Sequence, residues 1–150
     1  MNDHFSDTMD IFILLATGFE EETAVSCMTH LRGAGFPVSM IALSAGPVRG
    51  VHGLTINPDK TFADLNKETS AKMVIVPGNG QSTNALLMSP RFHRLINNTL
   101  ANDGYIVTTL SAENALKNAG ILHNPPPKHH IQQGNTALHE FTNQLVELIS

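Results

Sequence analysis

Residues 105–120 read YIVTTLSAENALKNAG, and this stretch decides the fold class. Its first part, YIVTTL, is a run of apolar and β-branched residues that predicts a strand buried inside a parallel sheet. Within a few residues the pattern becomes helical, with Ser111 at the corner. A buried strand that turns directly into a helix is the building unit of an α/β fold.

Further strand and helix signals alternate on either side of this unit. Strands are expected within residues 10–16, 37–44 and 72–80, and helices within residues 18–35, 89–103 and 137–150. Residues 48–59 predict a short irregular or hairpin segment, and residues 124–136 a proline-rich connection. This order predicts a doubly wound, mostly parallel sheet with helices on both faces.

In such a sheet the binding crevice lies at the carboxyl ends of the strands. The predicted topology therefore brings three loops together, within residues 17–23, 77–80 and 110–114. Candidate functional residues are expected in these loops.

Composition limits the possible partners. A chain of 150 residues predicts one domain, 1–150, with residues 1–9 as a flexible N-terminus. A formal charge of -4 without a long basic run argues against a nucleic-acid partner. Charged residues make up only 15%, so we expect a second subunit to cover part of the surface, as in a homodimer.

The single cysteine, Cys27, excludes an internal disulfide and a zinc site of several thiolates, and it favours the cytoplasm. We interpret it as a small buried residue. The apolar run at residues 9–16 is too short to span a membrane and predicts no membrane partner. His123, His129 and His130 surround a proline-rich loop without a clear further ligand, so we expect neither a metal nor a cofactor.

Several separated motifs, in the same order, resemble the ThiJ/PfpI superfamily, which includes the parkinsonism-associated deglycase. They are LLATGFEEETAV, VRGVHGLTINPD, VIVPGNG, SPRFHRLI and IVTTLSAENALKNAGIL. The resemblance implies a flavodoxin-like sandwich, related to class I glutamine amidotransferases and usually dimeric. It also implies a reactive cysteine at the strand-to-helix corner, a glutamate that contacts it, and a downstream histidine.

The chain departs from this pattern where the chemistry is expected. Ser111 occupies the cysteine position, and Thr23 the position of the functional glutamate, with Glu22 one place earlier. By its spacing from Gly120, His130 takes the place of the family histidine, with His129 beside it.

Serine lacks the low pKa of a thiol and needs a positioned base to become a nucleophile. Our first hypothesis is therefore a degenerate family member, a pseudoenzyme that binds or senses a small molecule through Thr23, Glu22, Gly78, Asn79 and Ala112 near Ser111.

Two alternatives stay open. The first is a hydrolase or transferase acting on a small carbonyl compound or ester. Ser111 would be its nucleophile, His130 its base, and the backbone N–H groups of Gly78 or Asn79 and of Ala112 its oxyanion donors. The second is a chaperone-like, protein-interaction dimer. In the non-catalytic interpretations Ser111 would cap the helix after the strand.

Overall fold

The computed structural model describes residues 10–121 and 129–150. Its helices and strands are, in chain order, β1 Ile11–Leu15, α1 Glu21–Gly33, β2 Val38–Ala42, β3 Val48–Arg49, β4 Thr55–Ile56, β5 Lys60–Thr61, a 3-10 turn at Phe62–Asp64, β6 Met73–Val76, α2 Gly80–Leu87, α3 Pro90–Ala101, β7 Tyr105–Thr108, α4 Leu110–Asn118, β8 His130–Gln132 and α5 Leu138–Ile149.

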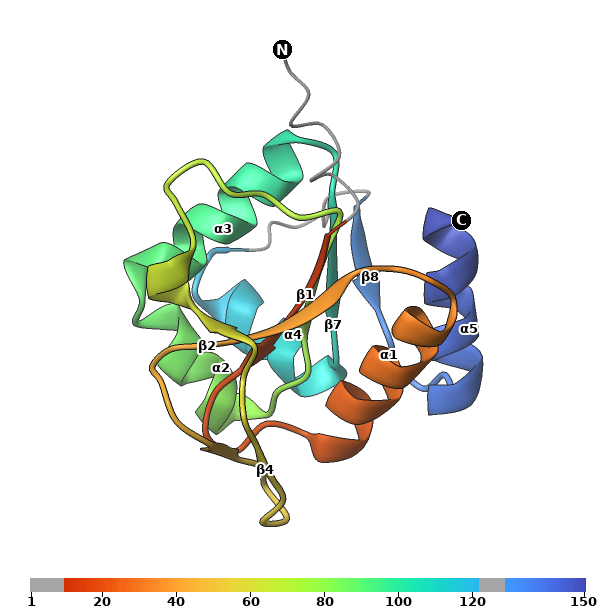
Figure 1. The fold of residues 1–150 in the computed structure, drawn as a ribbon, viewed down its shortest axis with the longest axis horizontal. Helices are drawn as coiled ribbons and strands as arrows, with labels where there is room; N and C mark the ends of the chain where they lie inside the picture. The colour runs from red at the N-terminus through yellow and green to blue at the C-terminus, as the bar shows by residue number, and fades with distance from the viewer. Residues whose placement is uncertain (1–9, 122–128) are drawn as a thin grey trace.

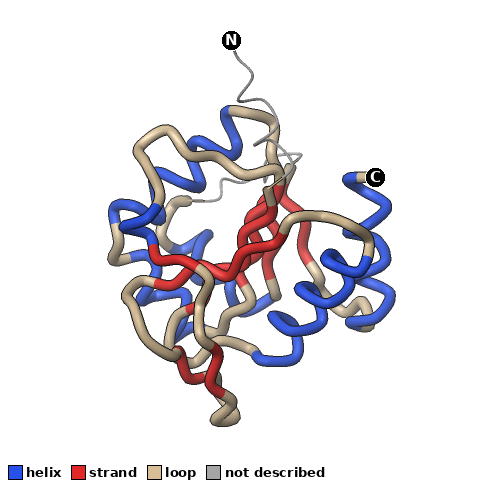
Figure 2. The backbone as a smooth tube through the Cα atoms, viewed as in Figure 1, coloured by secondary structure: helices blue, strands red, loops and turns tan. Residues whose placement is uncertain are grey.

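The centre of the molecule is a six-stranded sheet in the order β5-β2-β1-β6-β7-β8 (Figures 1 and 2). All of its neighbouring strands run parallel. Strands β3 and β4 form a separate antiparallel hairpin, which protrudes at the bottom of the view in Figure 1. The predicted doubly wound α/β sandwich is confirmed, and its main sheet is wholly parallel.

Strand β1 shows why this sheet must be covered on both faces. Each of its residues is buried, so no polar side is left for solvent. Ile11, Ile13 and Leu15 face one hydrophobic core, whereas Phe12 and Leu14 face the other. This alternation follows from the two-residue period of a strand.

Two groups of helices complete these cores, one on each face (Figure 1). Helices α1 and α5 cover the first face, where Cys27 and Leu31 of α1 meet Phe141 and Leu145 of α5. Helices α2, α3 and α4 cover the second. Along α5 the buried side chains are Phe141, Leu145 and Ile149, while Leu148 is 37% exposed; Ile149 therefore continues the apolar stripe.

Besides the two-residue edge strand β5, which pairs with β2, two elements were not predicted. Helix α2 follows β6 directly, where only a loop was expected before the next helix; its start depends on a reciprocal capping box between Asn79 and Ser82 rather than on a long apolar period. Strand β8 lies inside the segment expected to be a connection and pairs with β7, Ile106 opposite His130. Both elements are short, and their packing partners decide them.

Candidate functional site

The three loops predicted to meet do come together at the carboxyl edge of the sheet. The backbone N–H of Glu20, before α1, donates to the carbonyl of Pro77 after β6 at 2.8 Å. The hydroxyl of Thr109, after β7, donates to the carbonyl of Gly78 at 2.7 Å. These two bonds tie the loops that follow β1, β6 and β7 into one polar edge.

The corner after β7 is capped by Thr109, which corrects the expectation that Ser111 caps this helix. Thr109 is the N-cap of α4, and its hydroxyl oxygen accepts the N–H of Ala112 at 3.4 Å. Ser111 lies in the first turn of α4 and is exposed. Its hydroxyl makes no hydrogen bond within residues 10–121 and 129–150.

Two of the three backbone groups proposed as oxyanion donors, those of Asn79 and Ala112, have partners in this structure. The N–H of Asn79 donates to Ser82 Oγ at 3.1 Å. The N–H of Ala112 is the one accepted by Thr109. Both donors therefore serve helix starts, and a ligand oxygen would have to replace these partners to use them.

His130 lies on β8, and its imidazole Nε2 is 2.9 Å from Thr108 Oγ1. Burial lowers the pKa of His130; the nearby Glu113 carboxylate opposes this change and Lys117 adds to it. The ring of His129 instead stacks on Tyr105, with 4.7 Å between the centroids. In the part of the chain that the structure describes, neither histidine hydrogen-bonds Ser111, and His123 lies outside that part.

Thr23 stands where the resemblance places a functional glutamate, and it contacts a different acid. Its buried hydroxyl donates to Glu20 Oε1 at 3.4 Å. Burial raises the pKa of Glu20, and the hydrogen bond from Thr23 partly offsets the rise. The acid that Thr23 contacts is therefore Glu20, the N-cap residue of α1.

Glu21 is a functional candidate that the sequence analysis did not single out. Its carboxylate accepts the backbone N–H groups of His52 at 2.7 Å and Leu54 at 3.2 Å, and it lies 3.2 Å from His52 Nδ1. Gly50 makes this approach possible, since a Cβ there would lie 2.5 Å from the Glu21 side chain. Glu21 therefore fixes the hairpin loop against α1. Local sequence gives no signal for a contact between residues 31 positions apart.

A cleft of about 650 Å³ opens beside this contact. It is bounded by the start of α1, the β3–β4 loop, the turn before α2 and the segment leading into α5, and it is lined by Glu20, Glu21, Glu22, Thr23, Val51, His52, Leu54, Asn79, Gln133 and Leu138. Three predicted binding residues, Glu22, Thr23 and Asn79, are in this lining. Gly78, Ala112, Ser111 and His130 are not.

The lining gives the cleft an acidic character. Three consecutive glutamates, residues 20–22, contribute to it, and none of the described residues that line it is a lysine or an arginine. Apolar surface comes from Val51 and Leu54, each 49% exposed. A ligand there would meet carboxylates, amides and an apolar wall.

Comparisons with known proteins agree with this architecture. The DJ-1β protein of Drosophila melanogaster superposes with a TM-score of 0.82 at 20% identity, covering 95% of this chain and 90% of that one. Oxidized DJ-1 of Toxoplasma gondii gives 0.82 at 17% identity, covering 94% and 90%. A cysteine-to-alanine variant of a DJ-1 superfamily protein from Salmonella typhimurium gives 0.79 at 20%, covering 94% and 90%.

No curated protein matches the chain significantly in sequence. Among the helices of the described residues, none combines the length and the apolar character that crossing a membrane requires.

The sequence profile of the DJ-1/PfpI family matches residues 9–127, which is most of the chain. The chain belongs to the DJ-1/PfpI family.

Proposed function

We propose that this chain binds a small molecule in the cleft beside Glu20–Thr23 and acts as a binding or regulatory module without thiol-dependent catalysis. The observation that carries the proposal is the cleft itself. Its volume of about 650 Å³ lies within the range of about 300–1,000 Å³ that is usual for small-molecule sites.

The chemistry of the lining supports a neutral or positively charged ligand. Glu20 and Glu22 repel anions, and no cationic side chain among the described lining residues offsets them. The amides of Asn79 and Gln133 can bind hydroxyl or amine groups, while Val51 and Leu54 offer apolar contact. Polyols and amines are therefore the ligand classes that we propose.

The corner after β7 supports a role without covalent catalysis. Ser111 stands at the family's cysteine position, and none of the described residues hydrogen-bonds its hydroxyl. A serine without a base to take its proton is a poor nucleophile at neutral pH. Glu113, two residues further on and buried, adds a carboxyl to the same helix start, and a negative charge there would oppose a developing oxyanion.

A thermal-shift panel tests the binding proposal. Amines and polyols are expected to raise the melting temperature, whereas carboxylates and phosphates should produce no cleft-dependent shift. Glu22→Gln and Leu54→Ala should reduce the shifts, because both side chains line the cleft. Met88→Ala is a suitable control, since Met88 is 85% exposed and outside the lining. Equal shifts in all variants would exclude the cleft as the binding site.

A serine-directed fluorophosphonate probe tests the alternative chemistry. We expect no labelling of the wild-type protein. Labelling of wild type but not of Ser111→Ala would establish a reactive serine and replace the binding proposal with the hydrolase. His130→Gln would then show whether His130 supplies the base.

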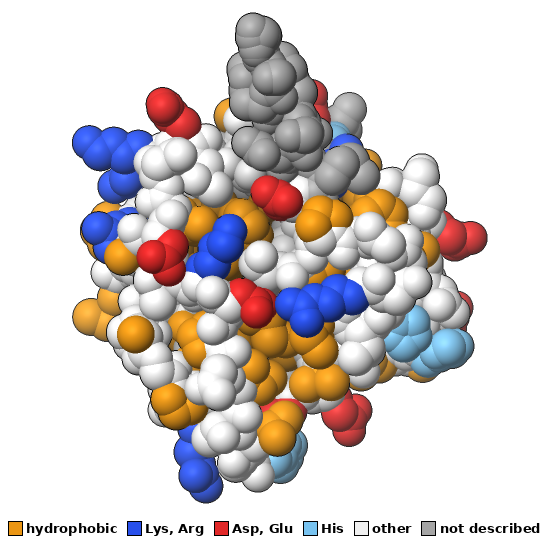
Figure 3. Space-filling model, viewed as in Figure 1, with side chains coloured by type: hydrophobic (Ala, Val, Ile, Leu, Met, Phe, Trp, Pro, Cys, Tyr) orange, Lys and Arg blue, Asp and Glu red, His pale blue; other side chains and the backbone are white. Residues whose placement is uncertain are grey.

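We also propose that the protein forms a homodimer, with the hairpin at the contact. Val51 and Leu54 are large apolar residues on this protruding loop, and hydrophobic side chains gather just above it on the face shown in Figure 3. Analytical ultracentrifugation should find a dimer for wild type and a monomer for Val51→Asp. A monomeric wild type would exclude this part of the proposal.

A further inference from the structure

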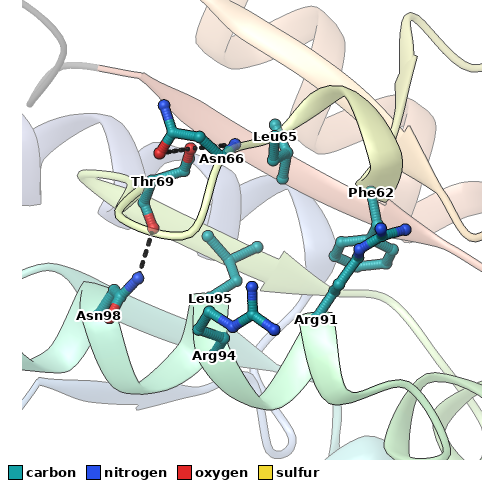
Figure 4. A pocket seen from close by; sticks show the side chains of 8 residues that line it. All are labelled: Phe62, Leu65, Asn66, Thr69, Arg91, Arg94, Leu95 and Asn98. Atoms are coloured by element: carbon teal, nitrogen blue, oxygen red, sulfur yellow. Dashed lines mark hydrogen bonds between the residues drawn. The ribbon is translucent and has the colours of Figure 1, made fainter.

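A second depression lies on the face of the sheet opposite α1 and α5, between α3 and the segment that follows the 3-10 turn. Figure 4 shows Arg91 and Arg94 reaching over its floor, which includes the buried side chains of Phe62 and Leu95. Both arginines come from α3, three residues apart, so they lie on the same side of the helix.

The two guanidinium groups have no acidic partner among the described residues. Two positive charges at this spacing repel each other and weaken a helix unless an anion compensates them. No acidic side chain of the described residues neutralises this pair, so its charge is open to an anion from solution.

Several other polar groups of the depression bond within the chain. Asn98 Nδ2 donates to the carbonyl oxygens of Lys67 at 2.8 Å and Thr69 at 3.1 Å. Asn66 Oδ1 accepts the hydroxyl of Thr69 at 3.1 Å, as Figure 4 shows. Asp64, in the adjoining 3-10 turn, accepts the N–H of Thr61 at 2.8 Å. Arg91 and Arg94 are the charged side chains of the lining and make no hydrogen bond or ion pair among the described residues.

We propose that Arg91 and Arg94 form a binding site for a phosphate group. The planar guanidinium donates paired hydrogen bonds to phosphate oxygens, and two of them can share one dianionic group. The recess holds only about 10 Å³, room for one ligand oxygen, so the rest of the ligand stays at the mouth. The site takes a terminal phosphate, either free or as a monoester, and is independent of the cleft.

Titration of the full chain with inorganic phosphate, followed by calorimetry at constant ionic strength in chloride, tests this site. Wild type should bind phosphate in preference to chloride. Arg91→Gln and Arg94→Gln should each weaken binding about three- to tenfold, and the double variant should lose it. Arg94→Lys keeps the charge but not the paired donors, and its affinity should lie between those of wild type and Arg94→Gln.

Arg49→Gln is the matched control, because it removes the same charge from an exposed position of β3, outside the depression. It should keep wild-type affinity, and circular dichroism should show every variant folded. A parallel titration with glycerol phosphate identifies the source: tighter binding than inorganic phosphate assigns a monoester, and weaker binding assigns free phosphate. The proposal is overturned if neither compound binds wild type, or if Arg49→Gln weakens binding as much as Arg91→Gln.

Discussion

The carboxylate of Glu21 holds the hairpin through His52, whose backbone N–H donates to Glu21 Oε2 at 2.7 Å. The same oxygen accepts the N–H of Leu54, and the other oxygen lies 3.2 Å from the His52 ring. Since α1 begins at Glu21 and the hairpin carries His52, this contact joins two walls of the cleft. The shape of the proposed binding site depends on one buried acid.

Glu21→Gln should lower the stability of the fold at neutral pH and make that stability less dependent on pH in the acidic range. Burial raises the pKa of Glu21, but the hydrogen bonds from its own backbone, from His52 and from Leu54 outweigh this and hold the pKa below its ordinary 4.5. Such a carboxylate stabilises the native state above its unfolded pKa, and the contribution is lost as the pH falls through the folded pKa. Melting temperatures measured downward from about pH 5 should therefore fall less steeply for Glu21→Gln than for wild type. Glu22→Gln, at the exposed neighbour, should keep the wild-type melting temperature at pH 7.

Gly50→Ala should break the same contact from the other side. The new Cβ would lie 2.5 Å from Cγ and Cδ of Glu21, so the acid or the loop has to move. We expect a loss of about 1–3 kcal/mol in the free energy of unfolding, as for other overpacked sites. Gly33→Ala, where a Cβ meets nothing within 4 Å, should be neutral or slightly stabilising in the same chemical denaturation. Equal stability of the two variants would contradict the contact.

His130 should make stability fall at mildly acidic pH. Burial lowers its pKa from the ordinary 6.5, Glu113 opposes this and Lys117 adds to it. The unfolded chain therefore binds the proton more readily, and native stability present above about pH 6.5 is lost as the pH falls below it. Denaturation at pH 7.5 and 5.5 should show a smaller difference for His130→Gln than for wild type. His139→Gln, at an exposed position of α5, controls for the loss of an imidazole.

Cys27 should be unreactive in the folded protein. Its side chain is fully buried, and burial raises the pKa of its thiol to about 12, so roughly one molecule in ten thousand carries a thiolate at pH 8. Iodoacetamide followed by mass spectrometry should find no label on the native protein and full labelling in denaturant. Labelling of the native chain at the denatured rate would show that this core opens.

Ser111→Cys combined with Thr23→Glu should restore an oxidisable thiol if the family geometry persists. Ser111 is exposed in the first turn of α4, where the helix N-terminus favours a thiolate. A glutamate at position 23 would stand beside Glu20, where burial already raises the pKa of a carboxyl. In its protonated form this new side chain would then donate a hydrogen bond to the oxidised sulfur. Peroxide titration with mass spectrometry should show oxidation at lower concentrations in the double variant than in Ser111→Cys. An inert thiol in the double variant would contradict the placement of residue 23.

Particular elements show how far the sequence could predict the fold. The strand IFILL was predicted from its continuous apolar run, and the helix at 138–149 from its apolar residues at helical spacing. These local patterns report which residues are buried. Strand β8 was missed because His130–Gln132 is short and polar, and becomes a strand only beside β7. Helix α2 was missed because two polar residues start it.

The candidate site divides in the same way. Glu22, Thr23 and Asn79 were placed near the cleft by their positions after β1 and β6, which the topology brings to one edge. The cleft is also lined by His52 from the hairpin and by Gln133 and Leu138 from the C-terminal segment. The local sequence does not predict where these two segments lie in the fold. The capping of α4 by Thr109 rather than Ser111 was likewise decided by a single hydroxyl that reaches Gly78.

The sequence by itself determined the layered sheet, its helical cover and the family, because these depend on short-range periodicity and on the order of motifs along the chain. The tertiary structure decided which acid holds the hairpin, which hydroxyl caps the corner helix, and which arginines have no acidic partner among the described residues. Those outcomes depend on distances between atoms far apart in the chain, and such distances exist only after the backbone has folded.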